Sequence, residues 1–246
     1  MSKHLSLRSG NPALSSNTFK NLDLSSTGRM TLEGTVNKTG ISLFILLLTS
    51  MYTFSNGNTG YIWVGFIGGF ILALTTIFKK EWAPYTVPLY AALEGLALGG
   101  ISAIYDSMYT GIVQQAVFLT FGIFFALLFA YKTKIIKPTE NFKLGVFAAT
   151  GGIFIVYLIS FIMSIFSNGL SIMNPMNGGL LSIGFSLFVV VIASLNLVLD
   201  FDFIEEASEQ GAPKYMEWYG AFGLLVTLIW LYLEILRLLA KLQSRD

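Results

Sequence analysis

The chain has 246 residues, of which 54% are hydrophobic and only 12% are charged, and its formal net charge is +1. Soluble domains carry about 25% charged residues, so this shortage of charge indicates a protein surrounded by lipid rather than by water. With no cysteine and a single histidine, His4, the sequence argues against a disulfide framework, a thiolate nucleophile and a histidine-based metal or catalytic site, and the balanced charge argues against nucleic acid as a partner.

The chain begins with a polar stretch, residues 1–37, which is rich in serine, asparagine and threonine and which we interpret as a cytoplasmic tail. A membrane-spanning helix needs about 20 apolar residues. Stretches of this kind follow at 39–55, 61–78, 85–105, 112–131, 143–166, 179–203 and 219–241. The loops between them are too short for a soluble domain. The sequence therefore predicts an all-α integral membrane protein, with a seven-helix membrane domain at 38–246.

Lysine and arginine set the expected orientation, because cytoplasmic loops are enriched in them. The loops after the second and fourth stretches carry lysines at Lys79, Lys80, Lys132, Lys134 and Lys137. The loops after the first, third and fifth stretches carry none. We therefore expect a multi-pass membrane protein whose N-terminus is cytoplasmic.

The last stretch fits this pattern less well, because Arg237, Lys241 and Arg245 lie near the end that should face outward. Either this helix crosses against the charge bias, or it is re-entrant and returns to the cytoplasmic side. A full crossing is favoured, because 219–241 contains enough apolar residues to span the bilayer.

Two glutamates lie at membrane depth, where ionisable groups are costly and usually functional. Glu94 lies about ten residues into its helix, roughly 15 Å deep. It is interpreted either as part of a proton or cation path or as a structural hydrogen-bonding group. Glu234 lies deep in the last helix, three residues before Arg237, so an intrahelical ion pair is the alternative to a functional role.

Two aspartates, Asp200 and Asp202, stand where the sixth apolar stretch stops, and Asn196 lies one turn before Asp200 on the same face. If the helix continues, the two aspartates point about 200° apart around its axis. One interpretation is a solvated acidic loop. The other is a calcium site formed by the oxygens of Asp200 and Asp202, or a titrating gate.

Several segments together resemble the Bax inhibitor family, and more narrowly its bacterial YccA-like branch. They are "NPAL" (11–14), "MTLEGTVNKTG" (30–40), "PLYAALEGLALGGISAIY" (88–105), "LNLVLDFDFIE" (195–205) and "LIWLYLEILRLLAKL" (228–242). The resemblance implies a seven-helix bundle with the last helix near the centre. It also implies a pH-sensitive calcium leak, in which an aspartate closing helix 6 and an aspartate in helix 7 share a proton, and a basic residue after helix 2 latches the first of them.

Carried onto this chain, the resemblance assigns the helix 6 aspartate to Asp200, with Asp202 second, and the latch to Lys79 or Lys80. The helix 7 aspartate is missing, because the matching position is Thr227. Three alternatives remain for the partner: Asp202 replaces it, Glu234 pairs with Glu94, or a re-entrant helix 7 returns Glu234 toward the cytoplasmic end.

The function that the resemblance implies is a pH-sensitive cation leak of the bacterial inner (plasma) membrane, with calcium as the permeant or bound ion and no other cofactor. Asp200, Asp202, Glu234, Lys79 and Lys80 are the gating candidates, and Glu94 and Asn196 are the ion-path candidates. Lipid, calcium and protons are the expected partners. The alternative is a non-conducting regulator of membrane proteolysis or stress response, with a membrane protease as its partner. We expect no enzyme, because no nucleophile–base, zinc-protease or phosphate-loop motif occurs in the chain.

Overall fold

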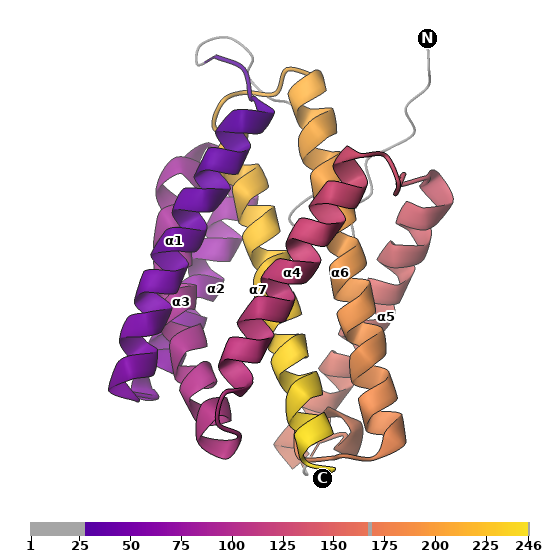
Figure 1. Cartoon of the computed structure of the whole chain (residues 1–246). Coiled ribbons are helices and arrows are strands. Elements are labelled where there is room, and N and C mark those ends of the chain that lie inside the picture. Colours follow the sequence, from indigo (N-terminus) through magenta and orange to yellow (C-terminus); the bar gives the residue numbers. More distant parts are fainter. Residues whose placement is uncertain (1–27, 167–168, 246) are drawn as a thin grey trace. The chain divides into compact units, whose positions relative to one another are not determined.

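A computed structural model describes residues 28–166 and 169–245 (Figure 1). Its α-helices are α1 (Leu32–Asn56), α2 (Gly60–Phe78), α3 (Ala83–Met108), α4 (Ile112–Lys132), α5 (Glu140–Phe166), α6 (Leu180–Glu209) and α7 (Met216–Gln243). Two short 3-10 helices, η2 (Lys80–Trp82) and η3 (Ser171–Met173), precede α3 and α6. All seven α-helices of the described part are long and apolar enough to cross a membrane. The predicted class, a seven-helix membrane protein, is confirmed.

The largest differences from the predicted bounds lie where polar residues extend a helix. α1 begins at Leu32, inside the segment assigned to the tail, because Thr31 caps it and accepts a hydrogen bond from the Gly34 amide at 3.0 Å. α6 continues to Glu209 rather than ending near residue 203. Asp200 and Asp202 therefore lie within the helix, and the prediction that they close it is wrong. The "NPAL" segment at 11–14 lies outside the described residues.

The described residues form two compact units. One consists of 109–201 and 227–245, and the other of 28–108 and 202–226. α6 and α7 are each one continuous helix that contributes its first part to one unit and its second part to the other.

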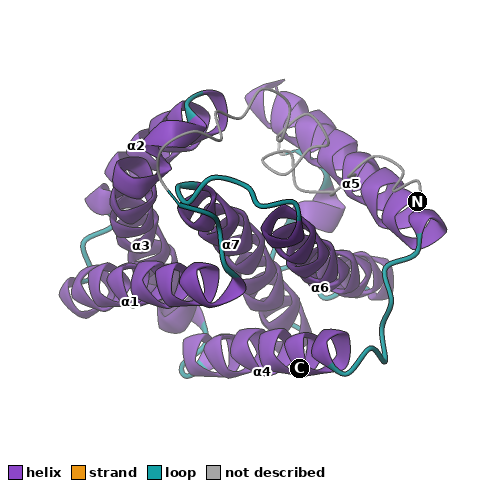
Figure 2. Ribbon diagram, turned by 90° about the horizontal axis from the view of Figure 1, so that it is seen from above, coloured by secondary structure: helices purple, strands orange, loops and turns teal. Residues whose placement is uncertain are grey.

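In the unit that contains α1, α2 and α3, α3 packs against both of the other helices (Figure 2). Glycines allow this close approach. A Cβ atom on Gly95 would lie 2.0 Å from Thr49 Oγ1, and one on Gly99 would lie 2.2 Å from the Ser50 carbonyl oxygen. Small residues at helix contacts are the usual means of close packing in membranes, where no hydrophobic effect drives helices together.

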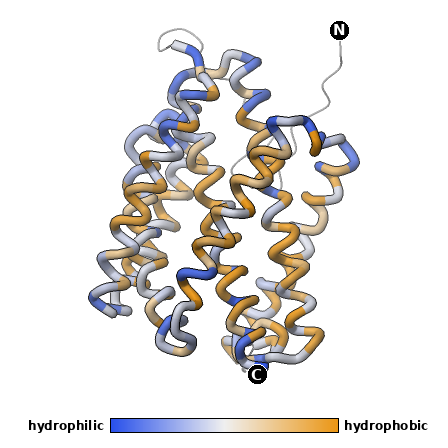
Figure 3. The backbone as a smooth tube through the Cα atoms, in the orientation of Figure 1, coloured by the Kyte–Doolittle hydropathy of each residue, from blue (hydrophilic) through white to orange (hydrophobic). Residues whose placement is uncertain are grey.

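In the other unit, a buried cluster of Ile153, Val189 and Ile192 joins α5 to α6, and Trp230 of α7 packs against it. α7 has the largest buried share of the described helices, as expected for the last helix of such a bundle. The remaining helices expose many large apolar side chains, including Phe118 and Phe154, which suits contact with lipid. Figure 3 shows the same pattern, with hydrophobic residues along most of each helix and hydrophilic residues gathered mainly toward helix ends and loops.

α7 is unbroken from Met216 to Gln243. At 1.5 Å per residue it is about 42 Å long, which exceeds the roughly 30 Å of a bilayer core. The re-entrant alternative is therefore not supported, and the length suits a full crossing. Two of the basic residues near its end, Arg237 and Lys241, are part of the helix and form hydrogen bonds with other protein groups.

Candidate gating and ion-pathway site

Asp200 forms the central contact of the predicted gate. Its side chain on α6 is fully buried, and its Oδ2 accepts a hydrogen bond from the Thr227 hydroxyl of α7 at 2.5 Å. Thr227 is the position where the resemblance places the second aspartate. When such a carboxyl group is ionised, a hydroxyl donor forms a hydrogen bond to it that is roughly twice as strong as a neutral one. The structure thus brings Thr227 to Asp200, at the place expected for a second acid.

Asn196 lies one turn before Asp200 and is 1% exposed. Its Nδ2 donates to Thr150 Oγ1 on α5 and to the Ile192 carbonyl oxygen, both at 2.9 Å. Within the described residues, its Oδ1 is a buried acceptor without a hydrogen-bond partner. This acceptor oxygen of Asn196 lies on the same face of α6 as Asp200.

Asp202 lies on the same continuous helix as Asp200. The helix is continuous through both residues, so their side chains diverge by about 200°. No group of three or more histidine, cysteine, aspartate or glutamate side chains suited to a metal ion occurs in the part of the chain that the structure describes. These observations give no support to a calcium site shared by Asp200 and Asp202, which stays a prediction. Asp202 is half-buried and belongs to the unit that contains α1.

Glu234 is 2% exposed and forms an ion pair with Arg237 of its own helix. Both of its oxygens accept from Arg237 Nη1 at 2.7 Å, and Oε1 also accepts from the Tyr157 hydroxyl of α5 at 2.5 Å. The Arg237 guanidinium lies 5.5 Å from the centre of the Tyr157 ring. This arrangement matches the structural ion-pair alternative, and it does not bring Glu234 to Asp200.

The two latch candidates differ. Lys79 ends α2 and is exposed. Lys80 is half-buried, and its Nζ lies 6.0 Å from the centre of the Tyr219 ring on α7. Of the two, Lys80 is the residue placed against α7.

Glu94 is half-buried on α3, against α2. A Cβ atom on Gly69 would lie 2.4 Å from Glu94 Oε1, so the carboxylate fits against the bare backbone of that glycine. Among the described residues, Glu94 has no hydrogen-bond or ion-pair partner. An acid kept unpaired within a membrane helix is a functional candidate by default.

The sequence profile of the Bax inhibitor 1 like family matches residues 11–244. The chain belongs to this family. The match covers nearly the whole chain and confirms, at the level of the family, the resemblance seen in the sequence motifs. No curated protein matches the chain.

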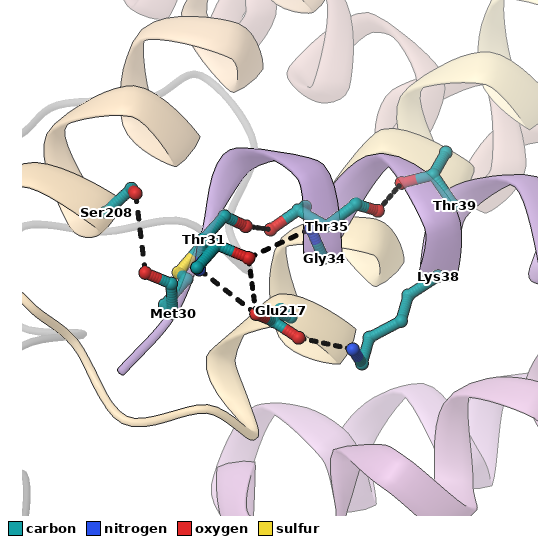
Figure 4. A network of polar contacts seen from close by, with 8 residues as sticks. All are labelled: Met30, Thr31, Gly34, Thr35, Lys38, Thr39, Ser208 and Glu217. Carbon is teal, nitrogen blue, oxygen red and sulfur yellow. Dashed lines mark hydrogen bonds and ion pairs between the residues drawn. The ribbon is translucent and has the colours of Figure 1, made fainter. Parts of the chain in front are cut away.

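This Bax inhibitor 1 like chain has a second polar cluster, which sequence reasoning missed (Figure 4). Glu217, at the start of α7, is fully buried, and its Oε1 accepts from both the amide and the hydroxyl of Thr31 at 3.0 Å. Its Oε2 forms an ion pair with Lys38. A Cβ atom on Gly34 would lie 2.2 Å from Glu217 Oε1, so a glycine is needed there. These contacts join the first turns of α1 and α7.

The segment before α1 strengthens this junction. The Met30 amide donates to the Ala212 carbonyl at 2.7 Å, and the Lys214 amide donates to the Gly28 carbonyl at 3.0 Å. Ser208 of α6 also donates to the Met30 carbonyl at 3.4 Å. In the sequence, the signal for this junction is the "MTLEGTVNKTG" segment, a motif of the family resemblance to which the sequence alone assigns no role.

Proposed function

We propose that this Bax inhibitor 1 like protein is a pH-sensitive cation leak of the bacterial inner membrane, with calcium as the permeant ion and a cytoplasmic N-terminus. The observation that carries the proposal is the buried contact between Asp200 on α6 and Thr227 on α7. It lies at the position where the family's pH sensor is expected, and it couples a titratable group to the contact between two membrane-spanning helices.

Protonation of Asp200 is the proposed opening step. While Asp200 is charged, the Thr227 hydroxyl donates to it and ties α6 to α7. A protonated carboxyl keeps only a neutral hydrogen bond, which is roughly half as strong. Acid therefore loosens the contact between the helices, and α6 is released to move. Threonine does not titrate, so within this contact Asp200 is the group that takes up the proton.

The ion path is proposed to use oxygens that the fold leaves unpaired. In one unit, Asn196 Oδ1 is buried without a partner among the described residues. In the other, the Glu94 carboxylate is likewise unpaired among them. Amide and carboxylate oxygens are the ligands that calcium prefers. Each group could replace part of the hydration shell of a passing cation.

The test is calcium flux into proteoliposomes that contain the full chain, at about pH 6, 7 and 8, so that a dependence on pH is measured on both sides of neutrality. Wild type is compared with Asp200→Asn, which cannot titrate, and with Glu140→Gln, a control at an exposed acid at the start of α5. We expect flux to rise with acidity in wild type and in the control, and to lose its pH dependence in Asp200→Asn. If wild type conducts no better than empty vesicles, the leak proposal is wrong and a non-conducting regulatory role takes its place.

A further inference from the structure

Lys241 is a buried cation that the proposed gate does not use. It lies near the C-terminal end of α7 with an exposed fraction of 0%. Its ammonium donates to the Ile172 carbonyl at 2.6 Å, to Ser186 Oγ at 2.8 Å and to the Ser182 carbonyl at 3.2 Å. An ammonium group has three donors, and three oxygens receive them.

All three of these oxygens are neutral. A lysine is almost never fully buried unless it is paired, because its charge must be taken out of water. Within the described residues, Lys241 makes no ion pair, and the acid on its side of α7, Glu234, is already bound to Arg237. The burial of the charge therefore relies on oxygen dipoles, which is how carbonyl groups in ion filters replace the water around a cation.

The oxygens are held together by the segment that bears them, and not by the lysine alone. Ile172 belongs to η3, and Ser182 and Ser186 lie one turn apart at the start of α6. The Ser182 hydroxyl donates to the Ile172 carbonyl at 3.1 Å, which links η3 to α6 independently of Lys241. The same connection touches the end of α7 elsewhere, since a Cβ atom on Gly178 would lie 3.1 Å from Arg245.

We infer that Ile172, Ser182 and Ser186 form an internal site for a primary ammonium ion, here named the ammonium site, which the chain fills with its own Lys241. The tethered cation fastens the connection between α5 and α6 to the C-terminal end of α7. With the tether removed, the site binds a free primary alkylammonium ion. It rejects quaternary ammonium ions, because they have no N–H groups to donate to the three oxygens.

Chemical rescue tests this inference without any flux measurement, so its outcome does not depend on the proposed leak. Lys241→Ala removes three methylene groups and the ammonium, which together correspond to n-propylammonium. We expect this variant of the full chain to unfold at a lower temperature than wild type. We also expect n-propylammonium chloride to raise the melting temperature of this variant until the effect saturates, and to recover at least about half of the decrease that the substitution causes. A ligand that binds only the folded state stabilises it. Wild type should not respond.

Three comparisons separate a built site from a general solvent effect. Tetramethylammonium chloride at the same concentration should not rescue Lys241→Ala. Lys241→Met fills the space with an apolar chain, so it should also lose stability but should gain nothing from n-propylammonium. Adding Ser186→Ala to Lys241→Ala should weaken the rescue, because one acceptor is gone. Equal rescue by both salts, or a Lys241→Ala variant as stable as wild type, would overturn the inference.

If Lys241→Ala does not yield folded protein, a double-mutant cycle decides. Ser186→Ala should lower the melting temperature when Lys241 is present and have a smaller effect in the Lys241→Met background, because contacting residues are not additive. Equal effects in the two backgrounds would show that the Ser186 hydroxyl does not hold the ammonium.

Discussion

Thr227 Oγ1 lies 2.5 Å from Asp200 Oδ2, so α7 places a hydroxyl where the family resemblance leads one to expect a second carboxylate. A pair of carboxylates shares a proton and titrates in two steps, whereas a carboxylate and a hydroxyl titrate in one. The contact between Asp200 and Thr227 should therefore contribute one titrating group to the proposed gate, and one substitution can add a second.

Thr227→Asp should convert this contact into a two-carboxylate pair. Two acids at hydrogen-bond distance cannot both be charged without strong repulsion, so they titrate as a coupled pair. We expect the pH profile of calcium flux to change from one transition to two, or to broaden clearly. Thr227→Ser, which keeps the hydroxyl, is the control and should follow wild type. A Thr227→Asp profile that overlays the wild-type curve would count against Asp200 as the sensor.

Thr227→Val should remove the donor and keep most of the side-chain volume. A hydrogen bond to a charged group contributes about 1.5–3 kcal/mol, so we expect the free energy of unfolding to fall by roughly 2 kcal/mol. The matched control is Thr120→Val in α4, a buried threonine whose hydroxyl donates to the Ala116 carbonyl of its own helix. Chemical unfolding in detergent measures both variants. Similar losses of unfolding free energy in the two variants would mean that the hydrogen bond to Asp200 stabilises the protein no more than an ordinary buried hydrogen bond.

Features that depend on neighbouring residues could be predicted from the sequence, whereas contacts between residues far apart in the chain could not. The seven apolar stretches are local signals, and each produced a helix. The predicted helix ends are wrong where polar residues extend a helix beyond its apolar stretch. This occurs at Thr31, which caps α1, and at the acidic residues that end α6. The site at Thr227 could be approached only through the family resemblance, because periodicity does not say which residue of another helix faces Asp200.

The Glu217 cluster lay beyond sequence reasoning for the same reason. Lys38 and Glu217 are 179 positions apart, and a single sequence carries no signal for such a pairing. Asp200 and Asp202 show the opposite difficulty. Two acids close in sequence suggest a shared site, but along a continuous helix their side chains point about 200° apart.

Glu217→Gln should show how much this cluster contributes to stability. The amide keeps an acceptor for Thr31, but it places a neutral group against the Lys38 ammonium. Breaking a buried pair by removing one partner costs about 3–5 kcal/mol, and we expect roughly 2–3 kcal/mol here because Lys38 remains partly exposed. Glu33→Gln, at an exposed acid in the same first turn of α1, is the control. A double variant with Lys38→Met should recover part of the loss; no recovery would argue against the ion pair.

Glu94→Gln should reduce calcium flux at every pH and leave the free energy of unfolding unchanged or higher. The carboxylate has no partner among the described residues, so its removal breaks no hydrogen bond or ion pair there. Keeping an unpaired charge in a membrane helix is costly, so the amide should be tolerated at least as well. Flux and unfolding are measured on the same preparation. Wild-type flux in this variant would remove Glu94 from the proposed ion path.

Two glycines of α1 offer a matched test of the junction between α1 and α7. A Cβ atom on Gly34 would lie 2.2 Å from Glu217 Oε1, whereas one on Gly40 would meet nothing within 4 Å. Alanine is the better helix former by about 1 kcal/mol, so Gly40→Ala should stabilise the protein by up to about that amount.

Gly34→Ala gains the same helix propensity but must displace the buried carboxylate from Thr31 and Lys38. Since a lost hydrogen bond to a charged group costs about 1.5–3 kcal/mol and the helix propensity gains about 1 kcal/mol, we expect a net destabilisation of about 0.5–2 kcal/mol. Thermal and chemical unfolding of the two variants side by side give the comparison. Because both changes add the same methyl group to the same helix, a difference in sign between them isolates the contact with Glu217. Stabilisation by both would show that Glu217 does not pack against Gly34.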